Sequence, residues 1–107
     1  MSKLETMPIY NHIIDGSHGW LQVPTKLLRE LGIFNHISRY SFFDIFGDTA
    51  FLEEDFDANM FLAKYQQVYG MRPMTRELRR ERIRDLLDTL ERFPDSGSEA
   101  LYMYSNL

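Results

Sequence analysis

The chain has 107 residues, with 12 lysines and arginines against 16 aspartates and glutamates, so its formal net charge is −4. Hydrophobic residues make up 44% of it, a composition that is typical of a globular domain and excludes a disordered or collagen-like chain. Cysteine is absent, which excludes disulfides, zinc–thiolate sites and a cysteine nucleophile. We read neither a membrane span nor a secretory leader, and therefore expect one cytoplasmic domain over residues 1–107, with 1–10 and 94–99 loosely held.

The first third of the chain predicts a turn, a short strand and a short helix. The pair Asp15-Gly16 signals the turn, and residues 20–23 have the composition of a strand that ends at Pro24. A helix over residues 26–31 follows, with a glycine directly after it in the position of a left-handed C-terminal cap. We expect the hydroxyl of Thr25 to cap the first turn of this helix.

The middle and end of the chain predict a hairpin and two longer helices. Residues 40–46 and 49–52 are β-prone runs separated by Gly-Asp, which favours an antiparallel pairing. Apolar residues recur with helical spacing over 58–69, and Asp57 is a candidate N-cap for that helix. A second long helix is expected over 76–92, and the apolar residues 100–104 could add a last strand.

These elements predict an α+β fold: a small antiparallel sheet of three or four strands, with the two longer helices on one face and one short helix. The predicted core consists of Trp20, Leu21, Val23, Leu28, Leu31, Phe42, Phe51, Phe61, Leu62, Tyr65, Leu86, Leu87 and Leu90. Several apolar residues lie outside the apolar stripes of the predicted helices, and their exposure would allow a homodimer. These residues are Phe43, Ile45, Met60, Tyr102, Met103 and Tyr104.

Acidic residues dominate the middle of the chain. No lysine or arginine stands between Arg39 and Lys64, whereas six acids do: Asp44, Asp48, Glu53, Glu54, Asp55 and Asp57. Their spacing does not fit an EF-hand loop, so no metal is predicted. Acids of this kind are typical of turns and helix caps. The sharper alternative is an acidic surface that meets the basic groove of a partner protein.

Arginine is concentrated further along, with six residues between Arg72 and Arg84. In the predicted helix 76–92 the apolar stripe ends where the arginines begin, so this half of the helix should overhang the core. Its arginines then form either a solvated, ion-paired face or a partner contact through Arg76, Arg79 and Arg80. With Arg82 they are also the candidates for nucleic-acid binding, which the net negative charge disfavours.

The sequence holds no recognisable catalytic motif. The three histidines lack the spacing of a zinc site, and no phosphate-binding glycine loop or nucleophile elbow is present. A small enzyme that uses His18 and a carboxylate is the weakest of the functional hypotheses. No cofactor is predicted.

One stretch of the chain resembles a group of small proteins encoded by bacteriophages and mobile elements of bacteria. The resemblance rests on HGWLQVP at 18–24, LGI at 31–33, ISRYSF at 37–42 and LEEDFD at 52–57 followed by Phe61. It covers residues 18–61, and this chain has phenylalanine at three positions where the group commonly has tyrosine or cysteine: Phe42, Phe51 and Phe56. The resemblance implies no catalytic residues, but it implies an accessory protein of the anti-defence kind, such as an anti-CRISPR protein.

The leading hypothesis is therefore a non-enzymatic protein that inhibits a bacterial defence complex by contact. The acidic segment 44–57 would dock on a basic surface, and the arginines at the start of the predicted helix would form a second contact. The partner would be a host protein complex, including one that itself binds nucleic acid, and no membrane is involved. The alternative is a nucleic-acid-binding regulator that uses the arginine-rich segment 76–92.

Overall fold

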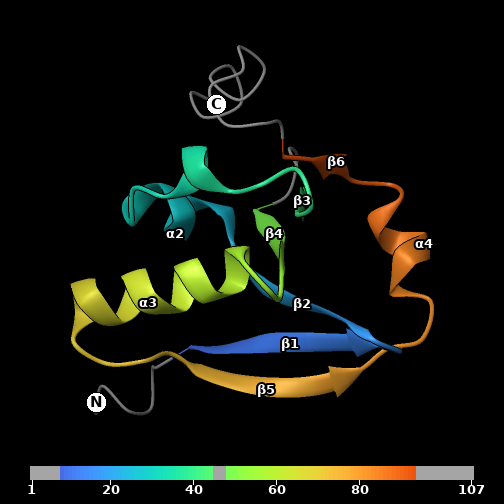
Figure 1. The fold of residues 1–107 in the computed structure, drawn as a ribbon, viewed down its shortest axis with the longest axis horizontal. Helices are drawn as coiled ribbons and strands as arrows, with labels where there is room; N and C mark the ends of the chain where they lie inside the picture. The colour runs from blue at the N-terminus through green and yellow to red at the C-terminus, as the bar shows by residue number, and fades with distance from the viewer. Residues whose placement is uncertain (1–7, 45–47, 94–107) are drawn as a thin grey trace.

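The structure is a computed structural model that describes residues 8–44 and 48–93. A six-stranded mixed sheet with the strand order β5-β1-β2-β4-β3-β6 forms its centre (Figure 1). The strands are β1 (Ile9–Asp15), β2 (His18–Pro24), β3 (Phe42–Phe43), β4 (Thr49–Glu53), β5 (Met74–Arg79) and β6 (Glu91–Arg92). The described helices are α2 (Thr25–Glu30), α3 (Asp57–Tyr69) and α4 (Ile83–Leu87), with a 3₁₀ turn η1 (Phe34–His36).

The fold is α+β, but the predicted sheet of three or four antiparallel strands with two longer helices is wrong. The sheet has six strands, and β5 runs parallel to β1. Of the helices in the described part of the chain, α3 alone is long, with 13 residues against six in α2 and five in α4. The chain passes from β4 through α3 to β5, and this crossover makes the parallel pairing possible.

The N-terminal strand β1 was not predicted. It pairs with β2 through a two-residue turn, with Asp15 opposite His18. Gly16 begins this turn at a φ of 60°, the positive value that tight hairpin turns require at their first central residue. Polar His12 and Asn11 interrupt the apolar alternation of β1, which explains why it lacks a strand signal. The expected turn at Asp15-Gly16 is confirmed.

The predicted helix over 76–92 is also wrong. Residues 74–79 form β5, a left-handed Arg82 (φ 62°) precedes α4, and β6 follows. Every residue of β5 is exposed, so no apolar face holds it in place. Instead it pairs with the open edge of β1 over six positions, from Ile9 opposite Met74 to Ile14 opposite Arg79. Backbone hydrogen bonding to an available edge outweighs the helix propensity of the methionine, arginines, glutamate and leucine in this segment, because intrinsic propensity is a weak determinant that tertiary contacts override.

The glycines predicted to end two helices are confirmed, whereas the two predicted N-cap residues are wrong. Gly32 and Gly70 both take positive φ after α2 and α3, as expected. Neither Thr25 nor Asp57 caps a helix, because each is the first residue inside one. The carboxylate of Asp57 instead accepts hydrogen bonds from the backbone N–H and hydroxyl of Ser38 and from the hydroxyl of Ser41.

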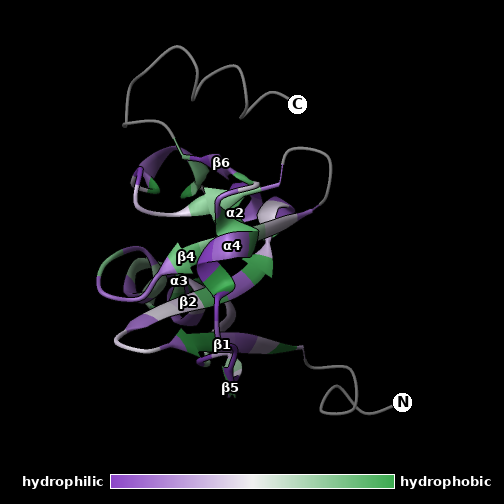
Figure 2. Ribbon diagram, turned by 90° about the vertical axis from the view of Figure 1, so that its right-hand side faces the viewer, coloured by the Kyte–Doolittle hydropathy of each residue, from purple (hydrophilic) through white to green (hydrophobic). Residues whose placement is uncertain are grey.

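The sheet carries a hydrophobic core on each face. On the first face, α2, η1 and α3 cover strand residues such as Leu21 and Leu52, and Phe61 of α3 packs in the same cluster. The second core is smaller and is covered by α4, which lies in front of the strands in Figure 2. It consists of Ile13, Trp20, Phe42, Phe51, Ile83 and Leu87, with Leu86 and Leu90 packed against it. Strand residues that follow one another, such as Trp20 and Leu21, therefore belong to different cores.

The remaining predictions have mixed outcomes. The strand at 20–23 and the pairing of the two β-prone runs are confirmed, although the first run is reduced to Phe42–Phe43. Ile9 and Tyr10, expected to be loose, begin β1. Phe43 is buried rather than available for a dimer. Ile45 and residues 94–107, with the possible last strand, lie outside the described residues. No helix in the described ranges has the length and apolar character needed to cross a bilayer.

Candidate functional site

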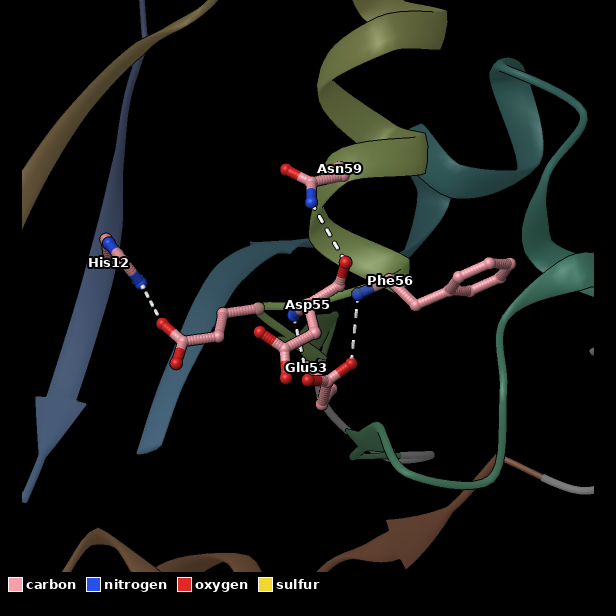
Figure 3. A network of polar contacts seen from close by, with 6 residues as sticks. His12, Glu53, Asp55, Phe56 and Asn59 are labelled. Atoms are coloured by element: carbon pink, nitrogen blue, oxygen red, sulfur yellow. Dashed lines mark hydrogen bonds and ion pairs between the residues drawn. The ribbon is translucent and has the colours of Figure 1, made fainter. Parts of the chain in front are cut away.

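A short turn connects β4 to α3 and is held rigidly by side-chain hydrogen bonds. The carboxylate of Glu53 accepts from the backbone N–H of Asp55 at 2.8 Å and from that of Phe56 at 3.1 Å. Asn59, one turn into α3, donates its amide to the backbone carbonyl of Asp55 at 2.9 Å (Figure 3). These bonds fix the backbone of the turn and therefore the directions of its side chains. His12 and Phe56 lie on opposite sides of the turn (Figure 3).

On one side of the turn, Glu54 reaches back to β1. Its Oε2 lies 3.3 Å from Nε2 of His12, and both side chains are about one-third exposed. The contact depends on Gly19, because a Cβ there would overlap with the Glu54 carboxylate. A small hollow of about 210 Å³ opens here, lined by His12, Leu21, Glu54, Asp55, Ala58, Asn59, Leu62 and Thr75. It is smaller than the roughly 300–1,000 Å³ of typical ligand pockets.

On the other side of the turn lies a larger hollow of about 580 Å³, which we call the Trp20 hollow. It is lined by His18, Trp20, Tyr40, Glu53, Asp55, Phe56, Arg84 and Arg92. Trp20 is 5% exposed, whereas Tyr40 is 57% and Phe56 is 66% exposed. Exposed aromatic side chains around a hollow are typical of binding surfaces.

The charged groups of the Trp20 hollow differ in how far they are already engaged. Glu53 is committed to the backbone of the turn. The guanidinium of Arg92 lies 4.5 Å from the centre of the Phe42 ring and donates to the carbonyl of Arg39 at 3.2 Å. Arg84 and Asp55 are exposed, and within the described ranges neither side chain forms an ion pair.

The predicted acidic surface is divided by the structure. Asp48 is exposed at the start of β4, whereas Glu53, Glu54 and Asp55 follow at its other end. Asp44 is half-buried before the segment that is not described. Asp57 is fully buried and bound to the two serines, so it has no part in a surface. The site therefore retains Glu54 and Asp55 as accessible acids next to the turn.

The predicted arginine surface is divided in the same way. Arg76 lies on β5 and donates to the side chain of Asn11 at 3.1 Å. Arg79 is the last residue of the same exposed edge strand. The backbone N–H of Arg80, which follows it, donates to the carbonyl of Ile14. The arginines at the Trp20 hollow are Arg84 and Arg92, which the sequence did not single out as partner contacts.

Sequence reasoning also missed the aromatic part of the site. Trp20 was assigned to the core, correctly, but its edge also lines the hollow. The available signal was that Tyr40 and Phe56 fall within the segments 37–42 and 52–57 that carry the resemblance. His18 lies in the Trp20 hollow, with Glu53 and Asp55 among the lining residues. No three metal-ligating side chains converge among the residues described.

The turn presents the exposed Phe56 ring and the Asp55 carboxylate. The Trp20 hollow has aromatic side chains in its walls together with the guanidinium groups of Arg84 and Arg92. The described residues around both hollows support recognition of a bound group through packing, charge and hydrogen bonds. No family model matches the chain, and no curated protein or solved structure matches it either.

Proposed function

We propose that this chain is a non-enzymatic accessory protein of a phage or mobile element, which binds a bacterial defence complex in the host cytoplasm and inhibits it by contact. The observation that carries the proposal is the exposure of Phe56, 66% of whose surface faces solvent on a rigid turn. The genomic setting rests on the resemblance over residues 18–61.

The turn supports such a role because it presents its side chains in a fixed arrangement. Glu53 and Asn59 hold the backbone of the turn, so little conformational entropy is lost when a partner binds. Aromatic residues dominate the binding energy of protein interfaces when they insert into a partner's pocket. Asp55 precedes Phe56 on the same turn and is also exposed, so its carboxylate favours a partner surface with basic side chains near such a pocket.

The contact surface differs from the one that the sequence predicted. A charge reversal at Glu53 would break two backbone hydrogen bonds of the turn, so it would confuse folding with binding. Asp55 has an exposed side chain, so Asp55→Lys tests charge alone. Phe56→Ser removes the apolar anchor. Val68→Ser is the matched control, because Val68 is 51% exposed on α3 and outside both hollows.

The test uses the tagged full chain in bacteria that carry one defined CRISPR–Cas complex at a time, challenged with a sensitive phage. We expect the wild-type chain to copurify with one such complex and to restore plaque formation. Phe56→Ser and Asp55→Lys should lose both effects while Val68→Ser keeps them. If both turn variants inhibit as well as the wild type, the turn is not the contact. If no complex is bound or inhibited by the folded wild-type chain, the proposed function is wrong.

A further inference from the structure

Strand β5 forms one edge of the sheet, and its outer side pairs with no strand among the residues described (Figure 1). Arg80 donates its backbone N–H to the carbonyl of Ile14 on β1 at 3.0 Å. In a parallel pair the backbone groups of alternate residues point to the same neighbour, so those of Arg76 and Leu78 also face β1. The N–H and C=O groups of the residues between and before them face outward, at Thr75, Glu77 and Arg79. An open edge of this kind is a template for one more strand.

The side chains of β5 are accessible on both faces of the sheet. Every residue of the strand is exposed, including Met74 at 50% and Leu78 at 40%. Leu78 is opposite Ile13 of β1, so these two apolar residues lie on the face of the sheet that carries the second core. A strand added to β5 would cover them and remove apolar surface from water.

The charge of this edge is opposite in sign to that of the whole chain. Residues 72–82 contain five arginines and two glutamates, whereas the formal net charge of the chain is −4. Arg76 and Arg79 both lie on β5, and within the described ranges neither forms an ion pair. Their positive charges favour a segment that carries carboxylates.

The same charges disfavour pairing between two copies of the chain. In a symmetric antiparallel pair of β5 strands, the residue at the two-fold axis lies opposite itself. An axis at Arg76, Glu77 or Arg79 would therefore place like charges opposite each other. An axis at Leu78 would place Arg76 opposite Arg80. Like charges that are directly opposite destabilise a strand pair, and charged edge strands commonly resist self-association in this way.

We propose that the outer edge of β5 binds an extended acidic peptide segment of a partner protein, which adds a further strand to the sheet. The backbone of the segment pairs with the outward-facing groups of β5, and its carboxylates lie beside Arg76 and Arg79. Apolar side chains of the segment cover Met74 and Leu78. Main-chain hydrogen bonds provide the affinity of this mode of recognition, and the side chains select the sequence. The inference goes beyond the proposed docking function and does not depend on it, since it concerns a second surface and the isolated chain.

The probe is a short fluorescein-labelled peptide in which glutamate and valine alternate, titrated into the full chain and followed by fluorescence anisotropy. We expect saturable binding that weakens as the salt concentration rises. One control peptide has lysine in place of glutamate, and the other keeps the glutamates but is N-methylated along its backbone. Neither control should bind, because each lacks one part of the required chemistry. Amide hydrogen exchange should slow at Glu77 and Arg79 when the peptide binds, but not at Leu78, whose N–H already faces β1.

Two variants of Glu77 separate strand addition from simple charge attraction. Glu77→Gln removes a negative charge and keeps the outward N–H, so it should bind the peptide at least as tightly as the wild type. Glu77→Pro removes the same charge together with that N–H, and proline is tolerated on an edge strand where the N–H faces solvent. It should lose binding, whereas a purely electrostatic contact would gain from the change.

Two arginine variants locate the charge contact. Arg79→Gln should weaken binding of the peptide about two- to fivefold, which is typical for the loss of one exposed charge pair. Arg84→Gln removes the same charge from an exposed position on α4, outside β5, and should leave the affinity unchanged.

The proposal is overturned if the acidic peptide does not bind, if the N-methylated peptide binds as well as its parent, or if folded Glu77→Pro keeps the wild-type affinity. If Glu77→Pro does not fold, the N-methylated peptide still decides the question on the wild-type chain. Binding of single-stranded oligothymidylate without binding of the peptide would assign the arginines to nucleic acid and would also overturn it. Asp55 and Phe56 are intact in every variant, and no defence complex is used. A failure here is therefore distinguishable from a failure of the docking proposal.

Discussion

The carboxylate of Glu54 occupies the space in which any residue other than glycine at position 19 would place its Cβ. The two segments are also joined by a hydrogen bond of 3.2 Å from the Glu54 N–H to the Gly19 carbonyl. A glycine in the interior of a strand normally weakens it, and close approach by another group is a common reason for its presence. Here the approaching group is a side chain that also contacts His12.

Gly19→Ala should therefore displace the Glu54 carboxylate without disturbing the fold. The backbone at Gly19 does not have a positive φ, so alanine brings no strain of its own. We expect the free energy of unfolding to fall by less than about 1 kcal/mol, since the lost contact is a partly exposed pair. Urea unfolding and the NMR signals of the His12 ring measure the two effects. In a Glu54→Ala background only the His12 ring, whose Nε2 would lie 2.7 Å from the new Cβ, still has to shift, so the same substitution should cost less; an equal cost there would contradict the explanation.

The buried carboxylate of Asp57 ties the start of α3 to the loop before β3. It is fully buried and accepts from the backbone and hydroxyl of Ser38 and from the hydroxyl of Ser41. Asp57→Ala leaves these donors without their acceptor, so we expect a loss of about 3 kcal/mol or more in the free energy of unfolding. Asp55→Ala, two residues earlier and exposed, is the control and should change it by less than about 0.5 kcal/mol. Equal effects in a urea titration would refute this role.

The second core depends on α4, a helix of only five residues. Ile83 and Leu87 are 1% and 0% exposed and pack in the cluster that contains Trp20. Ile83→Ala or Leu87→Ala should each lower the free energy of unfolding by about 2–4 kcal/mol and loosen the surroundings of Trp20, which shifts its emission to the red. Leu78→Ala on β5 should do little, because Leu78 is 40% exposed. If Ile83→Ala and Leu87→Ala cost no more than Leu78→Ala, the second core does not depend on α4.

Alkaline pH should destabilise the first core. Burial raises the pKa of the Tyr10 hydroxyl from 10.0 to about 12, and the nearby Tyr65 adds to the effect. The folded chain therefore keeps a proton that the unfolded chain loses above its ordinary pKa. The stabilisation is fully present below about pH 10 and is lost as the pH rises toward 12. In denaturant titrations between pH 8 and 12, Tyr10→Phe should show a smaller decline than the wild type, and an identical decline would contradict the assignment.

Local signals in the sequence were sufficient for parts of the fold. Gly70 follows the one clear amphipathic pattern and ends α3 as expected, and Asp15-Gly16 forms the turn that its composition indicates. For the candidate site, the sequence drew attention to Glu53, Glu54 and Asp55, which lie at the turn between the two hollows. It could not show that Asp57 turns inward, because burial depends on Ser38 and Ser41, which approach from another segment.

A few neighbouring residues are enough to specify the turn glycines, the strand that ends at Pro24 and the helix α3. Long-range pairing makes Met74–Arg79 a strand, because its partner β1 lies more than sixty residues away in the chain and supplies the backbone hydrogen bonds. The same holds for the Trp20 hollow, where Tyr40, Phe56 and Arg84 meet from separate segments. Local composition records the preference of a segment, whereas its conformation is set by the groups that the rest of the chain brings to it.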